Sequence, residues 1–159
     1  MNLIESYVMK ILIVEDQPVK RDQIKSFVIK EIDDVVEIVD KESLRGALKE
    51  ISTCDDYDLI LLDMSMPNFD PSEDVSLGGS PESFAGKELL EQMKLRDIVI
   101  PVIVITQYSS FEGGAVTLGS LSDEFSSKYK EVYRGSVYFD SAVESWKGQL
   151  LDLLRDINE

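Results

Sequence analysis

Short apolar runs alternate with amphipathic stretches along most of this chain. Each run is β-branched or leucine-rich and short enough for one strand, and the runs cover residues 7–14, 35–39, 59–62, 98–105 and 137–139. Between the runs, apolar residues recur at helical spacing, as they do at Leu44, Ala47, Leu48 and Ile51. The pattern predicts five strand-helix units and no hairpin between consecutive strands.

The runs at 59–62 and 98–105 contain no charged or hydrogen-bonding side chain, which is typical of strands covered on both faces of a parallel sheet. Parallel strands joined by right-handed helical crossovers make a doubly wound three-layer sandwich. We therefore expect an α/β fold, a five-stranded parallel sheet with helices on both faces. At 159 residues, the chain is expected to form a single domain, 1–159.

Two segments depart from the regular alternation. Residues 68–85, NFDPSEDVSLGGSPESFA, are acidic and rich in Gly, Pro and Ser, which predicts an unusually long strand-to-helix loop with an acidic insertion at about 71–85. After Gln107 the periodicity weakens, and glycines there predict a mobile segment before the next helix. Near the end, Ser141 and Glu144 form an S-x-x-E capping box, which predicts the start of the last helix.

The amino-acid composition limits which binding partners and which kinds of catalytic or metal site are possible. The formal charge of −15 disfavours phosphate-rich surfaces, so we expect no nucleic acid and no membrane as partner, and favour basic proteins or metal cations. The chain has no histidine, which excludes Ser-His-Asp and Cys-His catalysis and histidine metal sites. A single cysteine, no signal-peptide pattern in MNLIESYVMK and no long apolar run favour a cytoplasmic protein.

Polar side chains stand where three predicted strands end. Glu15 and Asp16 follow the first strand, Asp63 follows the third, and Thr106 ends the fourth. If these strands are neighbours, their carboxyl ends bring three carboxylates and a hydroxyl into one cleft. Close carboxylates repel one another, and a hard divalent cation such as Mg²⁺ relieves the repulsion. A carboxylate beside that metal can act as a nucleophile and form an acyl phosphate.

Each of these residues also has a purely structural interpretation. Asp63 could cap the end of a strand, and Glu15 and Asp16 could be acids favoured by the dipole of the following helix. Threonine is common at strand ends, so Thr106 alone carries little weight. The function therefore depends on the residues meeting in space.

The segments that carry these residues resemble a known family. They read ILIVED ending at Asp16, LILLDMSMP around Asp63, GKELL from Gly86 and PVIVIT ending at Thr106. Together they are similar to the receiver domain of two-component response regulators, which has a flavodoxin-like fold. The resemblance extends over nearly the whole chain.

The resemblance implies a role for each matched residue. Asp63 would accept a phosphoryl group from a histidine kinase or a phosphotransfer protein. Mg²⁺ would be bound by Glu15, Asp16, Asp63 and the backbone carbonyl of Ser65. Thr106 would be the switch hydroxyl, with Tyr138 as its aromatic partner. Such a domain signals to a downstream protein partner and has no enzymatic activity beyond its own phosphorylation and dephosphorylation.

The sequence departs from the family pattern at the end of the fifth strand. Receivers usually place Lys-Pro there, and the lysine bridges the acceptor and the phosphoryl oxygen. Here the strand reads VYFDSA, which puts Asp140 or Ser141 in that position. Lys128 lies at roughly the usual distance from Thr106, but we interpret it as a helix surface residue. In addition, Gln107 and Tyr108 follow Thr106 where a small residue is usual.

Three functions fit these observations. The first is a stand-alone receiver phosphorylated on Asp63. The second is a pseudo-receiver, a protein-binding module of the same fold that phosphorylation does not regulate. The third is a Mg²⁺-dependent phosphohydrolase, which is disfavoured because Ser65, rather than a second acid, stands two residues after Asp63.

Overall fold

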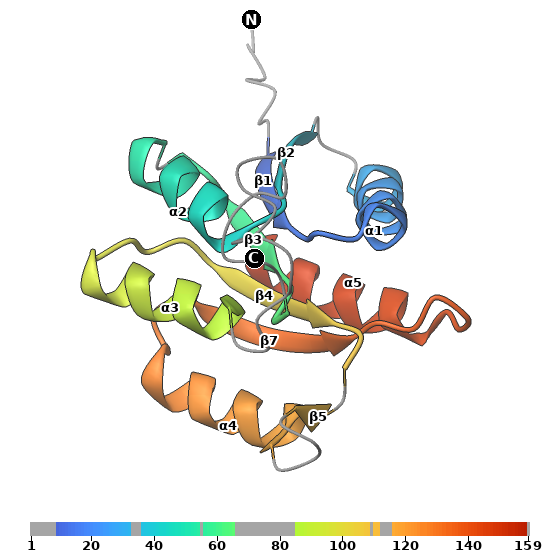
Figure 1. Cartoon of the computed structure of the whole chain (residues 1–159). Helices are drawn as coiled ribbons and strands as arrows, with labels where there is room; N and C mark the ends of the chain where they lie inside the picture. Colours follow the sequence, from blue (N-terminus) through green and yellow to red (C-terminus); the bar gives the residue numbers. More distant parts are fainter. Residues whose placement is uncertain are drawn as a thin grey trace, which may run out of the picture.

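A central parallel sheet organises the protein. The computed structural model describes residues 9–32, 36–54, 56–65, 85–108, 110–111 and 116–158. The sheet strands are β1 (Met9–Val14), β2 (Val36–Lys41), β3 (Leu59–Leu62), β4 (Val102–Thr106) and β7 (Tyr133–Tyr138). Their order across the sheet is β2-β1-β3-β4-β7, and every pairing between them is parallel (Figure 1). This order is that of a flavodoxin-like fold, so the predicted fold class is confirmed.

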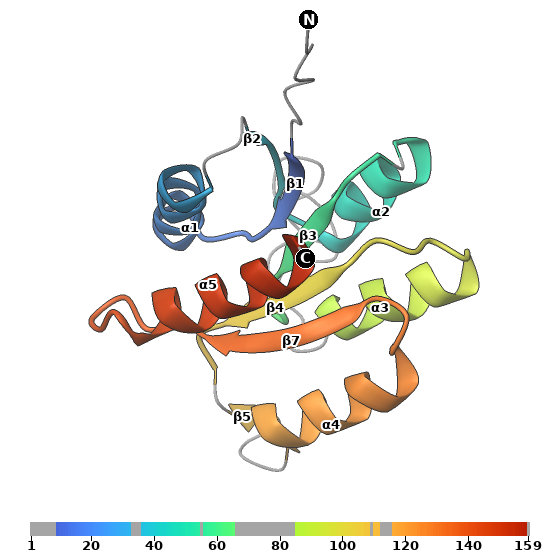
Figure 2. The same cartoon turned by 180° about the vertical axis from the view of Figure 1, so that it is seen from behind.

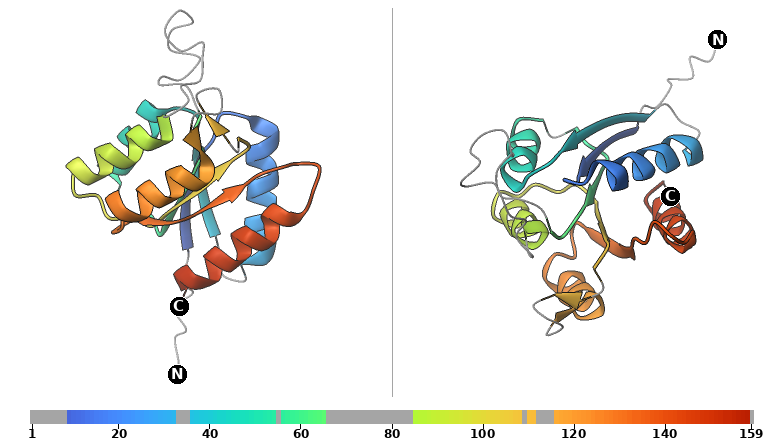
Figure 3. Two further views of the ribbon diagram at one scale, coloured as in Figure 1. Left: turned by 90° about the horizontal axis from the view of Figure 1, so that it is seen from below. Right: turned by 45° about the vertical axis from the view of Figure 1, so that its right-hand side comes forward.

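Helices cover both faces of this sheet. They are α1 (Pro18–Glu31), α2 (Leu44–Thr53), α3 (Ala85–Leu95), α4 (Leu118–Lys128) and α5 (Ser145–Asn158). Helices α1 and α5 lie on one face, and α2, α3 and α4 lie on the other (Figures 2 and 3). Side chains alternate between the two cores, so that Leu12 of β1 packs on the α2–α4 side and Ile13 packs on the α1–α5 side.

The strand register places the first residues after β1 and β3 at one edge. Leu62 of β3 pairs with Val14 of β1 on one side and with Val104 of β4 on the other. The backbone N–H of Asp63 then donates to the carbonyl of Val14 at 3.0 Å. Because of this pairing, Glu15 and Asp63 leave adjacent strands at the same level.

Two local predictions are wrong. Residues Ser110–Phe111 (β5) and Val116–Thr117 (β6) pair as antiparallel strands, so consecutive strands do form a ladder here. The predicted capping box at Ser141 does not start the last helix, because α5 begins at Ser145. A capping box does occur at α4, where Thr117 and Ser120 cap each other.

The last sheet strand begins earlier than the sequence predicts. β7 spans Tyr133–Tyr138, whereas apolar residues alone predicted 137–139. Its register shifts at Ile103, next to Gly135, whose φ of 139° lies in a region that favours glycine. A Cβ at Gly135 would approach Leu153 of α5 within 2.9 Å, so the glycine also permits close helix packing. Alternation along β7 is therefore interrupted.

Several other expectations concern residues near these elements. Lys128 is the last residue of α4, is 44% exposed and pairs with Glu91 at 3.3 Å, so its interpretation as a surface residue is confirmed. The acidic insertion at about 71–85 lies outside the described residues, apart from Ala85 at the start of α3. Among the helices that the structure describes, none is long and apolar enough to cross a lipid bilayer.

Candidate functional site at the carboxyl edge of the sheet

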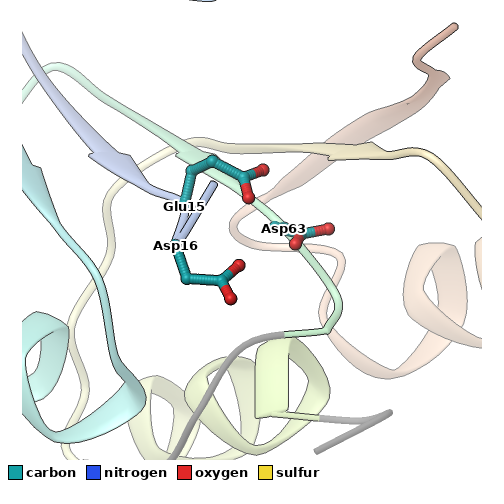
Figure 4. A group of neighbouring side chains, drawn as sticks. All are labelled: Glu15, Asp16 and Asp63. Atoms are coloured by element: carbon teal, nitrogen blue, oxygen red, sulfur yellow. The ribbon is translucent and has the colours of Figure 1, made fainter. Parts of the chain in front are cut away.

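Three carboxylates meet at the carboxyl ends of β1 and β3. One carboxylate oxygen each of Glu15, Asp16 and Asp63 lies within 4.8 Å of the other two, and Figure 4 shows the side chains gathered around one space. Glu15 and Asp63 are only 2% and 4% exposed, while Asp16 is half-buried. The sequence therefore predicted correctly that these three acids come together.

Close backbone packing fixes the loop that carries Asp63. The N–H of Gly86, in the first turn of α3, donates to the carbonyl of Met64 at 3.1 Å. A Cβ at Gly86 would stand 2.6 Å from the carbonyl oxygen of Asp63 and 2.9 Å from the Cα of Met64. Only a residue without a side chain allows α3 to approach the Asp63 backbone this closely.

Burial and like charge disfavour three ionised carboxylates in this space. Burial, followed by repulsion from Asp63, raises the pKa of Glu15 to about 8. Burial is also the main cause that raises the pKa of Asp63, and the nearby charge of Lys20 opposes it. A cation in the cluster therefore stabilises its ionised form.

Lys20 brings a positive charge to this cluster that the sequence analysis did not anticipate. Its Nζ lies 2.5 Å from Oε1 of Glu15 and 3.2 Å from Oδ1 of Asp63, and donates to the carbonyl of Ile105 at 2.9 Å. Neither carboxylate oxygen accepts a well-aligned hydrogen bond, so the two contacts are ion pairs. Lys20 itself is 2% exposed.

The sequence contained a signal for Lys20. Residues Lys20, Ile24, Phe27 and Val28 share the buried face of α1. A lysine four residues before an apolar stripe continues that stripe, and a buried lysine needs a partner of opposite charge.

The remaining predicted residues lie at the same edge of the sheet. Thr106 ends β4 and is fully buried, and its Oγ1 accepts the N–H of Tyr108 at 3.3 Å. Tyr138 pairs with Thr106 across the sheet and is 42% exposed. Ser65 is half-buried, and its backbone hydrogen bond to Asp63 lowers the pKa of that carboxyl.

Comparison with protein families matches residues 11–120 to the response regulator receiver domain. The chain belongs to this family. The receiver-domain assignment agrees with the strand order and with the acidic cluster at the sheet edge. Members of the family generally act as signalling modules rather than as enzymes, and this chain is accordingly a signalling domain.

Relatives of this receiver domain are known by sequence and by structure. The Detocs response regulatory protein DtcB of Enterobacter cloacae is 30% identical over 95% of this chain and 99% of its own length. The Mn²⁺-bound form of response regulator Rcp1 has a TM-score of 0.60 at 20% identity, over 91% of both chains. The structure of CheY6 from R. sphaeroides in complex with the P1 domain of CheA3 is also similar. Its TM-score is 0.59 at 20% identity, over 94% of this chain and 96% of that chain.

The acidic cluster suits a hard divalent cation. Its donors are all carboxylate oxygens, and Oε1 of Glu15 and Oδ1 of Asp63 are buried without an aligned hydrogen bond. Receiver domains bind Mg²⁺ at an acidic site, and this chain has an acidic cluster at the carboxyl edge of its sheet. A cation there would also oppose the effects of burial and of repulsion from Asp63, which together raise the pKa of Glu15.

Proposed function

We propose that this receiver domain accepts a phosphoryl group on Asp63 in a Mg²⁺-dependent reaction and passes the signal on by binding another protein. The observation that carries the proposal is the convergence of Glu15, Asp16 and Asp63 within 4.8 Å at the carboxyl edge of a receiver fold. Clustered buried carboxylates are unfavourable without a cation. A carboxylate beside such a cation, here Asp63, can act as the nucleophile toward phosphorus.

Asp63 is the group that reacts. One oxygen of its carboxylate attacks phosphorus, a new O–P bond forms, and the bond from phosphorus to the donor breaks. With a phosphohistidine donor, the imidazole nitrogen keeps the electron pair of the P–N bond and takes up a proton. The product is an acyl phosphate on Asp63.

The metal ligands in this proposal are Glu15, Asp16, Asp63 and the backbone carbonyl of Ser65. When bound by these residues, Mg²⁺ would supply positive charge that stabilises the negative charge of the reaction. The protein itself holds the carboxylates together, because β1 and β3 pair up to Leu62 and bury the two acidic tips.

The phosphoryl donor lies outside the 159 residues of this chain. The chain has no histidine, so a phosphohistidine cannot come from within it. A histidine kinase or a phosphotransfer protein is the expected donor, and the complex of CheA3 P1 with CheY6 gives a precedent for such a pairing among similar folds. A partner with basic residues suits the charge of −15.

Thr106 and Tyr138 are proposed to carry the signal away from Asp63. Thr106 is buried at the tip of the strand next to β3, so its hydroxyl is the natural donor to a phosphoryl oxygen. Tyr138 stands opposite Thr106 on β7 and is partly exposed. A shift of Thr106 toward the phosphoryl group would change the space next to Tyr138 and so the surface offered to a downstream protein.

One observation favours the pseudo-receiver as a second candidate. β7 is followed by Phe139 and Asp140, so the lysine that receivers usually place there is absent. Without a lysine at that position, phosphoryl transfer would lose one source of charge stabilisation. In that case the fold would bind its partner whether or not a phosphodonor is present.

Labelling by a small phosphodonor tests the proposal. Wild-type protein is incubated with acetyl phosphate and Mg²⁺, and the gain of one phosphoryl group is followed by intact mass spectrometry. Asp63→Asn should abolish the labelling, because an amide cannot form an acyl phosphate. Asp123→Asn, an exposed carboxylate on α4, is the matched control and should label like the wild type.

Two results would refute the proposal. Label retained on the Asp63→Asn variant would exclude Asp63 as the acceptor. Absence of label on the wild type, with both acetyl phosphate and a phosphorylated kinase partner, would favour the pseudo-receiver.

A further inference from the structure

Lys20 occupies a place that a surface lysine would not take. Its side chain leaves the first turn of α1 and is buried to 98% between the tips of three strands, since only 2% remains exposed. Burying an ammonium group is costly unless it is paired and hydrogen-bonded. The local structure meets this requirement, because Glu15, Asp63 and the carbonyl of Ile105 all lie within 3.2 Å of Nζ.

We propose that Lys20, from α1, supplies the positive charge that stabilises Asp63 and the phosphoryl group transferred to it. This inference rests on the proposed function, because it gives Lys20 a part in that reaction. Receivers usually have a lysine at the end of the strand that corresponds to β7, and this chain has none there. Lys20 would take over the role of that lysine, but it approaches Asp63 from α1.

The geometry of Lys20 suits the reaction. Its Nζ contacts Oδ1 of Asp63, so the ammonium does not block attack on phosphorus by Oδ2. When the O–P bond forms and the bond to the donor breaks, negative charge gathers on the phosphoryl oxygens next to Oδ1. An ammonium already held at that oxygen by the carbonyl of Ile105 can stabilise this charge without rearranging.

The aromatic ring of Phe139 adds to the pocket that holds this ammonium. Nζ of Lys20 lies 5.7 Å from the centre of that ring, which belongs to the residue directly after β7. Phe139 is buried, so an apolar ring closes the β7 side of the space. The end of β7 therefore contributes a wall to the site, and α1 contributes the charge.

Three other cations in the described part of the chain form ion pairs with acids outside the cluster. Arg21 pairs with Glu42 at 3.1 Å, Lys25 pairs with Asp40 at 3.0 Å, and Lys128 pairs with Glu91. Among the described lysines and arginines, Lys20 alone forms an ion pair with Asp63. This makes Lys20 the side chain to test.

The test compares Lys20→Met with Lys25→Met. Methionine keeps the length and the apolar stem of lysine but removes the charge, and Lys25 is a half-exposed lysine of the same helix, paired away from the site. Two quantities are measured on each variant, the rate of labelling by acetyl phosphate and the affinity for Mg²⁺ in the absence of phosphodonor.

The two quantities should move in opposite directions for Lys20→Met. Labelling should slow by about a hundredfold, because one preorganised charge near the reacting oxygens is lost. Affinity for Mg²⁺ should rise by about tenfold, since the ammonium no longer repels the metal from Glu15 and Asp63. Lys25→Met should leave both quantities as in the wild type.

A purely structural role for Lys20 predicts a different result. If Lys20→Met lowers labelling and Mg²⁺ affinity together, or leaves labelling unchanged while the wild type is labelled, the inference is wrong. Failure of the proposed function is distinguished from this, because in that case the wild type and Lys25→Met are not labelled either.

A measurement on the wild type serves if Lys20→Met does not fold. The side-chain ammonium of a buried lysine exchanges its protons slowly and can be observed in ¹⁵N-labelled protein. Beryllofluoride with Mg²⁺ mimics a phosphoryl group, and its addition should shift the Lys20 ammonium signal. A Lys20 signal that stays unchanged while the amide of Asp63 shifts would overturn the inference.

Discussion

The tips of β3 and β7 carry the same kind of residue at the same edge of one sheet, but the two acids have different surroundings. Asp63 follows β3 and is 4% exposed, next to two other carboxylates and Lys20. Asp140 comes two residues after β7 and is half-buried. Its carboxylate accepts the N–H of Ala142 at 2.9 Å, a bond within its own turn.

The position of each strand in the sheet explains this difference. β3 lies between β1 and β4, so an acid at its tip meets the residues that follow β1. β7 is an edge strand with β4 as its single neighbour in the sheet. An acid at the end of a central strand therefore lies in a buried cluster with acids from neighbouring strands, whereas the acid after the edge strand hydrogen-bonds to the backbone of its own turn. The variants below test how far this distinction holds.

Among the variants that test this difference, the largest expected effect is on the affinity for Mg²⁺. Asp16→Asn removes one oxygen ligand of the cluster, and we expect the affinity for Mg²⁺ to fall by about a hundredfold. Asp140→Asn should not change it. Binding can be followed by the fluorescence of Trp146, because its ring lies 4.9 Å from that of Phe139, which in turn lies beside Lys20.

Amide chemical shifts give an independent reading of the same titration. If the wild type shows no change in shifts or fluorescence up to roughly tens of millimolar Mg²⁺, the proposed metal site does not exist. If Asp140→Asn weakens binding as much as Asp16→Asn does, the tip of β7 belongs to the site and the contrast with β3 is lost.

The sequence was sufficient for the central part of this site. The uninterrupted apolar runs of β3 and β4 favoured strands buried in a parallel sheet, and the acids directly after β1 and β3 meet if those strands pair. Glu15, Asp16 and Asp63 were therefore predictable as neighbours without coordinates. Their roles as ligands and acceptor remain predictions.

Lys20 and the start of β7 were not found, for different physical reasons. Lys20 has a long flexible stem, and only the fold determines whether its ammonium reaches solvent or a buried carboxylate. β7 contains Arg134, Gly135 and Ser136, which break the apolar pattern, because an edge strand is less covered than a central one. Periodicity predicted only the end of this strand.

A substitution that disturbs the backbone packing beside Asp63 should have the next largest effect, on the free energy of unfolding. Gly86→Ala places a methyl group 2.6 Å from the carbonyl oxygen of Asp63, so the backbone must move. We expect the free energy of unfolding to fall by about 2 kcal/mol, as overpacking of a core does. Thermal or urea denaturation measures this change, and acetyl phosphate labelling should slow because the Asp63 loop is displaced.

The same substitution elsewhere provides the control for that variant. Gly148 is exposed in α5, and a Cβ there meets no atom within 4 Å. Gly148→Ala should stabilise the protein by up to about 1 kcal/mol, which is the difference in helix propensity. Equal effects of the two variants would mean that α3 does not approach the Asp63 backbone as closely as described.

The smallest expected effect concerns Asp140 itself. Asp140→Ala removes the acceptor of the Ala142 N–H, an exposed bond within one turn, and should lower the free energy of unfolding by about 0.5–1 kcal/mol. Asp140→Asn keeps an acceptor oxygen and should cost less. The labelling rate of Asp63 should be the same in both variants as in the wild type, since the carboxylate of Asp140 hydrogen-bonds within its own turn and does not contact the cluster. A severalfold change in the labelling rate, in either direction, would show that this charge acts on Asp63 and that the two strand tips form one electrostatic unit.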